Sequence, residues 1–370
     1  MSYEVSGVLK RTMKGMFVLR DPNRSFRRGP KDSIVPMKVV RQCGLCEGAS
    51  VTGTSEKGKR GGQILKSVDS VCGMSVEDFK RRTPFGRLVA ITPDERFRLG
   101  DSGDSSMRII DLVAPIGKGT RGLIVSPPKA GKTVLLQKMA NAITAGSLGT
   151  RVIVLLIDER PEEVTMFRRG VEGAEVFSST IDFSSSEHVE LAELVLANVQ
   201  VDLECGKDVV VLVDSLTRMG RSFNQNGYGS QRRTMSGGMG AGALEIPRKF
   251  FGLARNIENG GSVTIIASCL IDTGSRMDQL IFEEFKGTGN SEIVLDRQLA
   301  QARIFPAIDL GASGTRKEEL LYSEDDIRKI GMMRKVLSSY HRKEVIESLH
   351  KLMNKYPSNE ELLDGLTANV

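Results

Sequence analysis

Four unbroken aliphatic runs mark the chain from residue 108 onward, at residues 122–125, 152–157, 209–213 and 263–267. Runs of this kind are typical of strands that are buried on both faces of a sheet. The stretches between them, notably 133–146 and 187–204, have helical patterns. Alternating strands and helices predict an α/β domain with a parallel sheet, whose site lies at the carboxyl ends of the strands.

The first 75 residues have a different pattern, in which short β segments alternate with glycine, proline and charged clusters. Five segments have strand-like composition: VSGVLKRT, MFVLR, SIVPMKVV, SVTGTS and QILKSV. This number of short strands predicts a small barrel of the oligonucleotide-binding type. The segment 79–107 is rich in Arg, Pro and Gly without sustained periodicity, which predicts a linker. Residues 324–355 again have a helical pattern.

Charge is distributed unevenly along the chain. The formal net charge is +6, but residues 1–100 hold 20 Lys and Arg against 10 Asp and Glu, while the rest of the chain holds 32 against 36. A basic N-terminal part predicts an anionic partner such as nucleic acid. Aromatic residues are scarce, with 14 Phe, 5 Tyr and no Trp, so the core must be mainly aliphatic.

The same patterns exclude several protein classes. The longest aliphatic run has six residues, far short of the roughly 18 that a membrane span needs. The first residues lack the apolar stretch of a signal peptide, and five cysteines fit free thiols better than a disulfide framework. We therefore expect a cytoplasmic protein with no membrane partner. Cys43, Cys46 and Cys72 are too few for a structural zinc site and are interpreted as small hydrophobic residues.

The strongest chemical signal is the segment SPPKAGKT at 126–133, which lies between the first aliphatic run and the first helix. Backbone N–H groups at such a strand–loop–helix junction wrap a phosphate. Lys132 would neutralise the β and γ oxygens, and the hydroxyl of Thr133 would ligate Mg²⁺. The strict pattern begins with Gly, whereas this one begins with Ser126. The alternative is a chance Gly-Lys-Thr at a helix start, which the flanking strand and helix argue against.

Two carboxylates follow other aliphatic runs, at the same edge of the predicted sheet. Asp214 ends the run at 209–213, where a Mg²⁺-organising aspartate belongs. Taken alone, it is equally an aspartate that caps the next turn. Glu159 closely follows the run at 152–157 and would polarise an attacking water. Its alternative is an N-cap cluster before the next helix.

Longer segments of the chain resemble the transcription termination factor Rho family. The matching segments are VSPPKAGKT at 125–133, LLIDERPEEVT at 155–165, VDSLTRMGRSFN at 213–224, PRKFFGLARNIENGGSVTIIASCLIDTGSRMD at 247–278, FEEFKGTGN at 282–290, RIFPAID at 303–309 and SGTRKEELL at 313–321. They cover nearly all of 108–322, and the Pro-Pro of the phosphate loop is a mark of this family, which answers the missing first Gly. The resemblance implies an oligonucleotide-binding or cold-shock-like barrel at 1–78, a linker at 79–107, and a RecA-like P-loop ATPase domain with C-terminal helices at 108–370.

Family members are ring-shaped homohexamers that hydrolyse ATP to move along single-stranded RNA. The resemblance therefore implies an RNA-dependent ATPase and helicase that releases nascent transcripts from RNA polymerase, with ATP and Mg²⁺ as cofactors and elongation factors as further partners. The nucleotide contacts that it implies are Gly117, Lys118, Gly119, Thr120, Arg121, Gly122, Lys129, Ala130, Gly131, Lys132, Thr133, Val134, Arg160 and Phe305, whose ring would stack on adenine.

The same resemblance implies how hydrolysis is catalysed. Lys132 and Glu159 are the catalytic residues within the subunit, and Thr133 and Asp214 are the metal ligands. Arg316 matches an arginine finger that the neighbouring subunit supplies, and Arg303 is a second sensor across that interface. A guanidinium that arrives from a neighbour neutralises charge in the transition state, an effect of about 10³–10⁵ in rate.

Two loops are expected to face the pore of the ring. Residues 225–242 are Gly-rich and basic, which is typical of a functional loop, and they correspond to the family's Q loop. Residues 272–278 correspond to its R loop. The implied contacts to the RNA backbone are Arg232, Arg233, Thr234 and Arg276. Without the resemblance, a solvated surface loop explains the composition equally well.

The barrel departs from the family at its RNA-binding strand. Family members carry two aromatic rings there that stack on bases, whereas this chain reads GMFV at 15–18. Strand alternation puts Met16 and Val18 on the face of those rings and Phe17 on the opposite face. We therefore expect weak, salt-dependent RNA binding with little preference for cytidine. Its contacts would be Arg20, Arg24, Arg27, Arg28 and Lys31, with Phe26 as a stacking ring.

Two other functions stay open at the level of the sequence. One is a related hexameric P-loop ATPase that acts on a protein, which the basic barrel and the basic pore loop argue against. RNA stimulation of ATP hydrolysis separates this function from an RNA motor. The other is an RNA-binding assembly factor whose ATPase is vestigial, which the presence of Lys132, Thr133, Glu159, Asp214 and Arg316 argues against.

Overall fold

Five strands close into a barrel at the N-terminal end of the computed structural model, which describes residues 2–58, 62–227, 236–240 and 242–367. The strand order around the barrel is β1-β2-β3-β5-β4, and β4 closes it by pairing with β1. The bounds are Ser2–Arg11 for β1, Phe17–Arg20 for β2, Ser33–Val35 for β3, Ser50–Lys57 for β4 and Gln63–Val71 for β5. The predicted five-stranded barrel is confirmed.

One predicted strand of the barrel is half helix. The segment SIVPMKVV forms β3 only as far as Val35, and α1 then runs over Met37–Cys43. Pro36 separates the two because it has no N–H to donate to a strand ladder, while its fixed φ suits the start of a helix. Alternation of apolar residues alone does not show this change of structure.

The aliphatic runs form the centre of a nine-stranded sheet with the order β14-β13-β7-β12-β10-β8-β9, to which β11 and β6 add at the side. The predicted strands β7, β8, β10 and β12 are parallel neighbours. The bounds are Ala90–Ile91 (β6), Arg121–Ser126 (β7), Arg151–Glu159 (β8), Glu175–Thr180 (β9), Val209–Asp214 (β10), Arg255–Ile257 (β11), Ser262–Leu270 (β12), Ser291–Val294 (β13) and Gly314–Thr315 (β14). The carboxyl ends of the parallel strands β7, β8, β10 and β12 meet at one edge.

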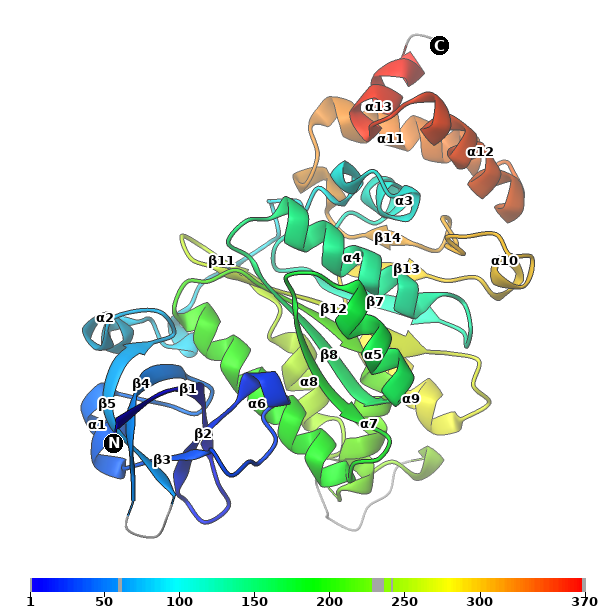
Figure 1. Ribbon diagram of the computed structural model, residues 1–370. Helices are drawn as coiled ribbons and strands as arrows, with labels where there is room; N and C mark the ends of the chain where they lie inside the picture. The colour runs from blue at the N-terminus through cyan, green and yellow to red at the C-terminus, as the bar shows by residue number, and fades with distance from the viewer. Residues whose placement is uncertain (1, 59–61, 228–235, 241, 368–370) are drawn as a thin grey trace.

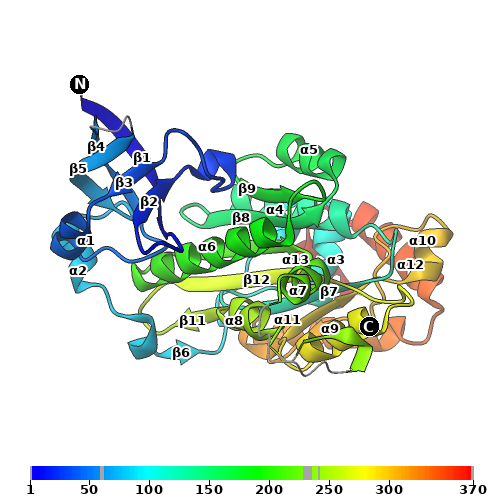
Figure 2. The same ribbon diagram turned by 90° about the horizontal axis from the view of Figure 1, so that it is seen from below.

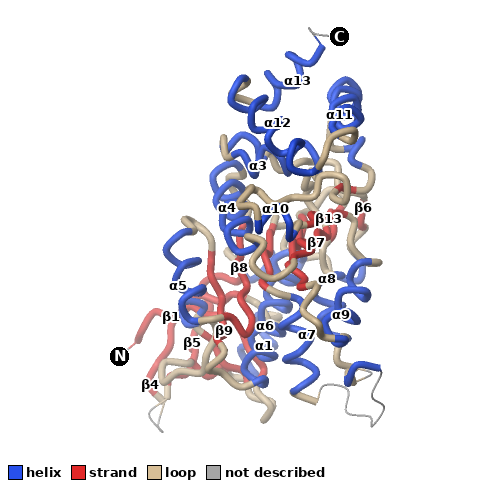
Figure 3. Tube along the Cα trace, turned by 90° about the vertical axis from the view of Figure 1, so that its right-hand side faces the viewer, coloured by secondary structure: helices blue, strands red, loops and turns tan. Residues whose placement is uncertain are grey.

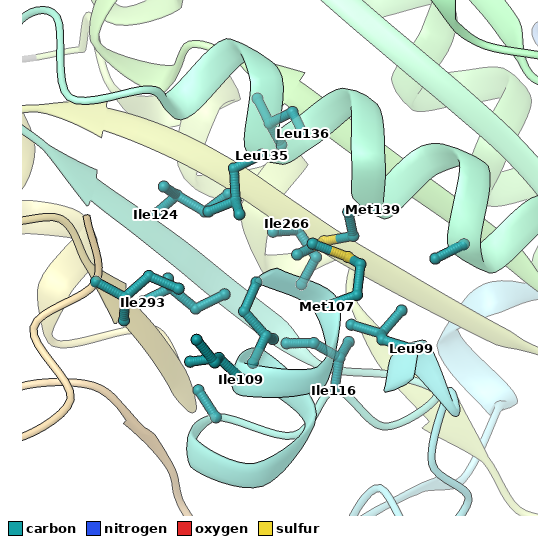
Figure 4. Packing of buried hydrophobic residues seen from close by; sticks show 14 of the residues in the cluster. Leu99, Met107, Ile109, Ile116, Ile124, Leu135, Leu136, Met139, Ile266 and Ile293 are labelled. Carbon is teal, nitrogen blue, oxygen red and sulfur yellow. The ribbon is translucent and has the colours of Figure 1, made fainter. Parts of the chain in front are cut away.

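Helices cover both faces of this sheet. Alternate residues of β10 point to opposite sides, with Val210 and Leu212 in one hydrophobic cluster and Val211 in the other. The first face carries α3 (Ser105–Val113), α4 (Lys132–Gly146) and α5 (Pro161–Gly170); the second carries α6 (Ser185–Glu204), α7 (Leu216–Gln225), α8 (Glu245–Gly252) and α9 (Arg276–Lys286). Figure 4 shows Ile124 and Ile266 of the sheet packing against Leu135 and Met139 of α4. The core is aliphatic, as the composition predicts.

The barrel packs against the C-terminal half of α6, the long helix that runs along the sheet in Figure 2. The side chain of Asn198 on α6 donates to the carbonyl oxygen of Gly48 at 2.8 Å and to the hydroxyl of Ser50 at 3.2 Å. Arg82, which follows α2 (Val76–Arg81), pairs with Glu204 at 2.9 Å. These five residues define what we call the barrel–α6 joint.

The segment 79–107 contains ordered structure. It contains the end of α2, the short strand β6 and the start of α3. Strand β6 adds to the large sheet by pairing with β11. Figure 1 shows the barrel at one end of the molecule and the C-terminal helices at the other, with the sheet between them.

The C-terminal helices are α11 (Glu324–Leu337), α12 (Arg342–Lys355) and α13 (Asn359–Thr367), which follow the short α10 (Arg297–Gln301). Figure 3 shows them stacked above α3. Arg108 on α3 holds them by donating to the carbonyl oxygens of Met353, Tyr356 and Ser358. A membrane-spanning helix is absent from the described part of the chain, since none there combines the length and apolar character that a bilayer requires.

Candidate functional site

A phosphate-binding loop follows the carboxyl end of β7 and leads into α4. Gly131 is the N-cap of α4 and has φ of +93°, a left-handed conformation that glycine adopts without steric cost. The first N–H groups of α4 have no intrahelical acceptor, so they and the helix dipole favour an anion there. The loop geometry that the sequence predicts is therefore formed.

Lys132 and Asp214 meet beside this loop. The Nζ atom of Lys132 lies 2.6 Å from both carboxylate oxygens of Asp214, which is fully buried at the end of β10. The hydroxyl of Ser268 on β12 donates to the same carboxylate at 2.8 Å. A buried carboxylate is stabilised only when it is paired in this way. Lys132 thus supplies the positive charge that pairs with Asp214 beside the phosphate loop.

Glu159 lies at the same edge of the sheet, at the end of β8. Its side chain is 1% exposed, its Oε1 atom accepts from Arg218 at 3.1 Å, and its Oε2 atom has no hydrogen-bond partner within the described residues. Burial raises the pKa of Glu159 to about 7, and the nearby carboxylate of Asp214 adds to the rise. A carboxyl group with this pKa and one unbonded oxygen fits the predicted role of a general base.

The predicted metal ligands fit magnesium. The hydroxyl of Thr133 and the buried carboxylate of Asp214 both belong to the phosphate-loop edge, and Mg²⁺ takes hard oxygen ligands of this kind together with phosphate oxygens and waters. Thr133 donates to Glu163 at 3.4 Å, a long bond that leaves the hydroxyl oxygen accessible. Groups of three or more metal-ligating side chains do not occur among the described residues.

A pocket of about 290 Å³ adjoins the phosphate loop. The ring of Phe305 lines it, is 45% exposed, and lies close to Gly131. The predicted residues Lys129, Ala130, Gly131 and Val134 line the same pocket. Arg303 and Arg160 are exposed at this edge, Arg160 as the N-cap of α5. The pocket has the size and the exposed aromatic face to hold a nucleotide base.

One group of predicted nucleotide contacts is placed elsewhere. Residues 117–122 precede and begin β7, so they lie at its amino end, about 20 Å from the phosphate loop. Lys118 is paired with Glu95 and Asp208, and Thr120 is buried. Gly117, Lys118, Gly119, Thr120, Arg121 and Gly122 are therefore separated from the phosphate loop of their own chain, and their contact with a nucleotide stays a prediction.

Arg316 lies at this opposite end of the sheet as well. It follows β14, and its backbone N–H donates to the carbonyl oxygen of Asn290 beside the start of β7. A pocket of about 520 Å³ is lined there by Arg316 and three other cations. Those three are Arg121, Arg255 and Lys317. Four cations therefore line one open surface at the end of the sheet opposite to Lys132.

The described parts of the two predicted pore loops are neighbours. The backbone at Gly237 lies against Arg276 and Met277 at the start of α9. Arg276 is exposed, while Asp278 holds the turn by pairing with Arg221. The other predicted contacts in the longer loop, Arg232, Arg233 and Thr234, lie outside the described residues.

Two predicted RNA contacts on the barrel are buried. Arg20 is 8% exposed and paired with Asp32 at 2.7 Å, so it is not free to bind a phosphate. Phe26 is 6% exposed, and its ring packs on Phe177 of β9 at 4.6 Å between centroids, so it is not free to stack on a base. Both predictions are wrong because Asp32 pairs with Arg20 and Phe177 covers the ring of Phe26. The remaining predicted contacts are exposed; they are Arg24, Arg27, Arg28 and Lys31.

Sequence reasoning missed two residues that contact Asp158 and Glu159 at the end of β8. Arg218 donates to Glu159 and to the carbonyl oxygen of Asp158. His188, on the first turn of α6, lies 3.8 Å from Asp158 and bonds Ser179 at 2.8 Å. Arg218 falls within a matched segment, which was an available signal. His188 has no local pattern around it, so only the fold reveals its position.

Comparison with known proteins gives one family model and many relatives. The model of the ATP synthase alpha/beta family, nucleotide-binding domain, matches residues 106–315. A transcription termination factor Rho from Akkermansia muciniphila is 47% identical over 97% of this chain and 76% of its own length. The Rho of Cereibacter sphaeroides is 46% identical over 98% of this chain and 88% of its own length. The Rho of Mycobacterium leprae is 48% identical over 91% of this chain.

Other relatives are longer, and solved structures share the fold. The chain spans 57% of the Mycobacterium leprae relative and 48% of the Streptomyces lividans one. A prototypical ATPase from a bacterial type III secretion system has a TM-score of 0.64 at 23% identity, covering 76% of this chain and 86% of that chain. The ATP synthase subunit NeqB from Nanoarcheaum equitans has a TM-score of 0.59 at 19% identity, covering 68% and 63%. At these identities the two structures establish a shared ATPase fold.

Proposed function

Because this chain belongs to the transcription termination factor Rho family, we propose that it is an RNA-dependent ATPase that moves along nascent transcripts and releases them from RNA polymerase. The observation that carries this proposal is the separation of Lys132 and Arg316. Lys132 follows the carboxyl end of β7, and Arg316 lies beside its amino end. One chain therefore holds two incomplete halves of a hydrolysis site.

The halves complete each other when copies of the chain are arranged head to tail. A heterologous interface of that kind closes into a ring, here a homohexamer. In such a ring Arg316 of one subunit reaches the terminal phosphate bound by its neighbour. Gly119 and Arg121, which line the same surface as Arg316, then contact that neighbour's nucleotide. This arrangement gives the segment 117–122 a role that it cannot have within one chain.

Within the subunit, the nucleotide is held along the phosphate-loop edge. The base stacks on Phe305 and the phosphates lie against the N-terminus of α4. Arriving phosphate oxygens draw Lys132 away from Asp214, whose carboxylate then becomes available, together with Thr133, to hold Mg²⁺. The ion would neutralise developing charge on the phosphates when bound. Arg303, exposed beside Phe305, senses the nucleotide across the interface.

Glu159 handles the attacking water. In its carboxylate form the free Oε2 atom accepts a proton from a water molecule, while Arg218 holds Oε1 in place. Arg160, the residue after Glu159 in the chain, extends toward the phosphates. Hydrolysis then depends on both a positioned water and the guanidinium from the neighbour.

RNA binding is divided between the pore and the barrel. Arg276 and the loop at 225–242 contact the RNA backbone in the pore. On the barrel, Arg24, Arg27, Arg28 and Lys31 supply an exposed basic surface, while Met16 is exposed where a stacking ring is expected. Binding there is thus mainly electrostatic and weakens with salt. We retain the division into a barrel at 1–78, a connecting segment at 79–107 and an ATPase domain at 108–370.

Hydrolysis measured with and without RNA tests the proposal. We expect several-fold stimulation by single-stranded RNA and loss of hydrolysis in Lys132→Ala, because the phosphates then lose their counter-charge. Lys335→Ala, which removes an exposed lysine on α11, should match the unmodified chain. Hydrolysis that is present but indifferent to RNA would instead assign the chain to ATPases that act on proteins. No hydrolysis under either condition would leave an RNA-binding assembly factor.

A further inference from the structure

One face of the C-terminal helix α12 contacts the loop that carries Phe305. Ile346 and His350 are four residues apart on this helix, so their side chains lie on the same face. Ile346 is fully buried and packs in a small apolar cluster with Leu299 and Ala307. These two residues lie on either side of Phe305 in the sequence. Helix α12 is therefore packed against the base of this loop.

Backbone hydrogen bonds fix the loop on both sides of Phe305. The N–H group of Ile304 donates to the carbonyl oxygen of Leu299 at 2.9 Å. The carbonyl oxygen of Ala307 accepts from the N–H group of Asp296 at 2.7 Å. Because these bonds hold the neighbours of Phe305, the direction of Phe305 itself depends on the contact that its own carbonyl group makes.

His350 makes that contact from the face of α12 that Ile346 also occupies. The Nε2 atom of His350 lies 3.0 Å from the carbonyl oxygen of Phe305, which is an ordinary hydrogen-bond length. Because a carbonyl oxygen can only accept, Nε2 must carry the proton and donate it. The side chain of a C-terminal helix is thus joined directly to the backbone of Phe305.

The ring of Phe305 is the part of this loop that faces a ligand. Phe305 is 45% exposed, and its ring lines the pocket beside the phosphate loop together with Gly131. A ring with this exposure is restrained by packing less than a buried ring is. The backbone from which it projects therefore sets the direction in which the ring faces.

We propose that His350 is a positioning residue for the base of a bound adenine nucleotide. Its hydrogen bond to the carbonyl oxygen of Phe305 holds the ring in the direction that stacks on the base, and so raises the affinity for ligands that carry one. This inference rests on the stacking of the base on Phe305 in the proposed function, and it is independent of RNA. It gives α12 a part in nucleotide binding, although none of the predicted nucleotide contacts lies on that helix.

Equilibrium binding of ADP and of inorganic pyrophosphate to the whole chain tests the inference, because both ligands carry phosphates and only ADP carries a base. His350→Ala should raise the dissociation constant for ADP about three- to tenfold, the effect of one hydrogen bond, and leave that for pyrophosphate unchanged. His350→Gln, which keeps an N–H donor at the end of its side chain, should restore most of the affinity for ADP. Lys351→Ala, which changes the next and exposed residue of α12, should bind both ligands like the unmodified chain.

A double variant shows whether the effect passes through the ring. Phe305→Leu alone removes the stacking, so it should weaken the binding of ADP and leave that of pyrophosphate unchanged. When His350→Ala is added to Phe305→Leu, the dissociation constant for ADP should not rise further, because the two changes remove the same contact with the base. Unchanged pyrophosphate binding also shows that each variant is folded.

Three results would overturn the inference. They are unchanged ADP binding in His350→Ala, equal losses of ADP and pyrophosphate binding in that variant, or a further loss of ADP binding when His350→Ala is added to Phe305→Leu. A general loosening of α12 would give the second result. An unmodified chain that binds ADP no more tightly than pyrophosphate would reject the base contact of the proposed function and this inference with it. Hydrolysis indifferent to RNA, with the ADP results as expected, would reject the RNA motor alone.

Discussion

Glu159 shows how the surroundings of one residue set its chemistry. Arg218 holds Oε1, and Oε2 has no hydrogen-bond partner within the described part of the chain. Burial raises the pKa of this carboxyl group to about 7, close to neutral pH. A general base works best when its pKa lies close to the working pH. The position of Glu159 therefore suits the proton transfer from an attacking water that we propose.

The pH dependence of hydrolysis should report this pKa. Glu159 is active as a carboxylate, so turnover at saturating ATP and RNA should fall about tenfold per pH unit below pH 7 and level off above it. Glu159→Gln should lower turnover by about 10²–10⁴ and remove this dependence. Glu162→Gln, which changes an exposed carboxylate on the same segment, should keep the turnover of the unmodified chain and its pH dependence. A profile with no inflection between pH 6 and 8 in the unmodified chain would contradict the assigned role.

Single residues were predictable where a contiguous motif encodes their geometry. Lys132 and Thr133 begin the helix after the loop that follows β7, Asp214 ends β10, and the structure places all three at one edge of the sheet. Arg20 and Phe26 were not predictable, because Asp32 and Phe177 bury them through tertiary contacts that no local pattern contains.

Among the elements, α6 and the barrel come into close contact at Gly48, just before β4. A Cβ atom at this position would lie 2.3 Å from the backbone of Ala197 on α6, closer than packing permits. Gly48 also has φ of +89°, which favours glycine. Gly73 has a similar φ of +79° but no described atom within 4 Å of such a Cβ. The two glycines thus share a left-handed backbone conformation, but only Gly48 lies against the backbone of α6.

Alanine substitutions at these glycines should separate the two effects. Gly73→Ala should lower the free energy of unfolding by about 1 kcal/mol through its left-handed backbone alone. Gly48→Ala should cost about 1–3 kcal/mol more, because the barrel must shift away from α6. Urea denaturation of both variants measures the difference. Equal losses would mean that the barrel–α6 contact is looser than the structure indicates.

Long elements were predicted well and short ones were not. Strands such as β8 and β10 are continuous aliphatic runs, so composition reveals them. The two-residue strands β6 and β14 pair because larger elements bring them together, and neither has a pattern of its own. Their absence from the prediction made 79–107 resemble a linker and hid the surface around Arg316.

For the whole molecule, the test of a shared hydrolysis site is a mixture of two defective chains. Lys132→Ala removes the phosphate contact and Arg316→Ala removes the guanidinium from the neighbour, so each alone should lose about 10³-fold or more in turnover. In rings assembled from both chains, about one interface in four pairs an intact Lys132 with an intact Arg316. Co-expressed mixtures should therefore hydrolyse well above either variant alone. Activity equal to the mean of the two would indicate that Arg316 acts within its own chain.

The length of α6 has a mechanical consequence. This 20-residue helix is a stiff rod of about 30 Å. Its last turns carry the barrel through Asn198 and Glu204, and its first turn sets His188 beside Asp158, the neighbour of Glu159. In the proposed function, α6 therefore connects the part of the chain that binds RNA to the part that carries Glu159, and tension on a bound transcript would act along this helix.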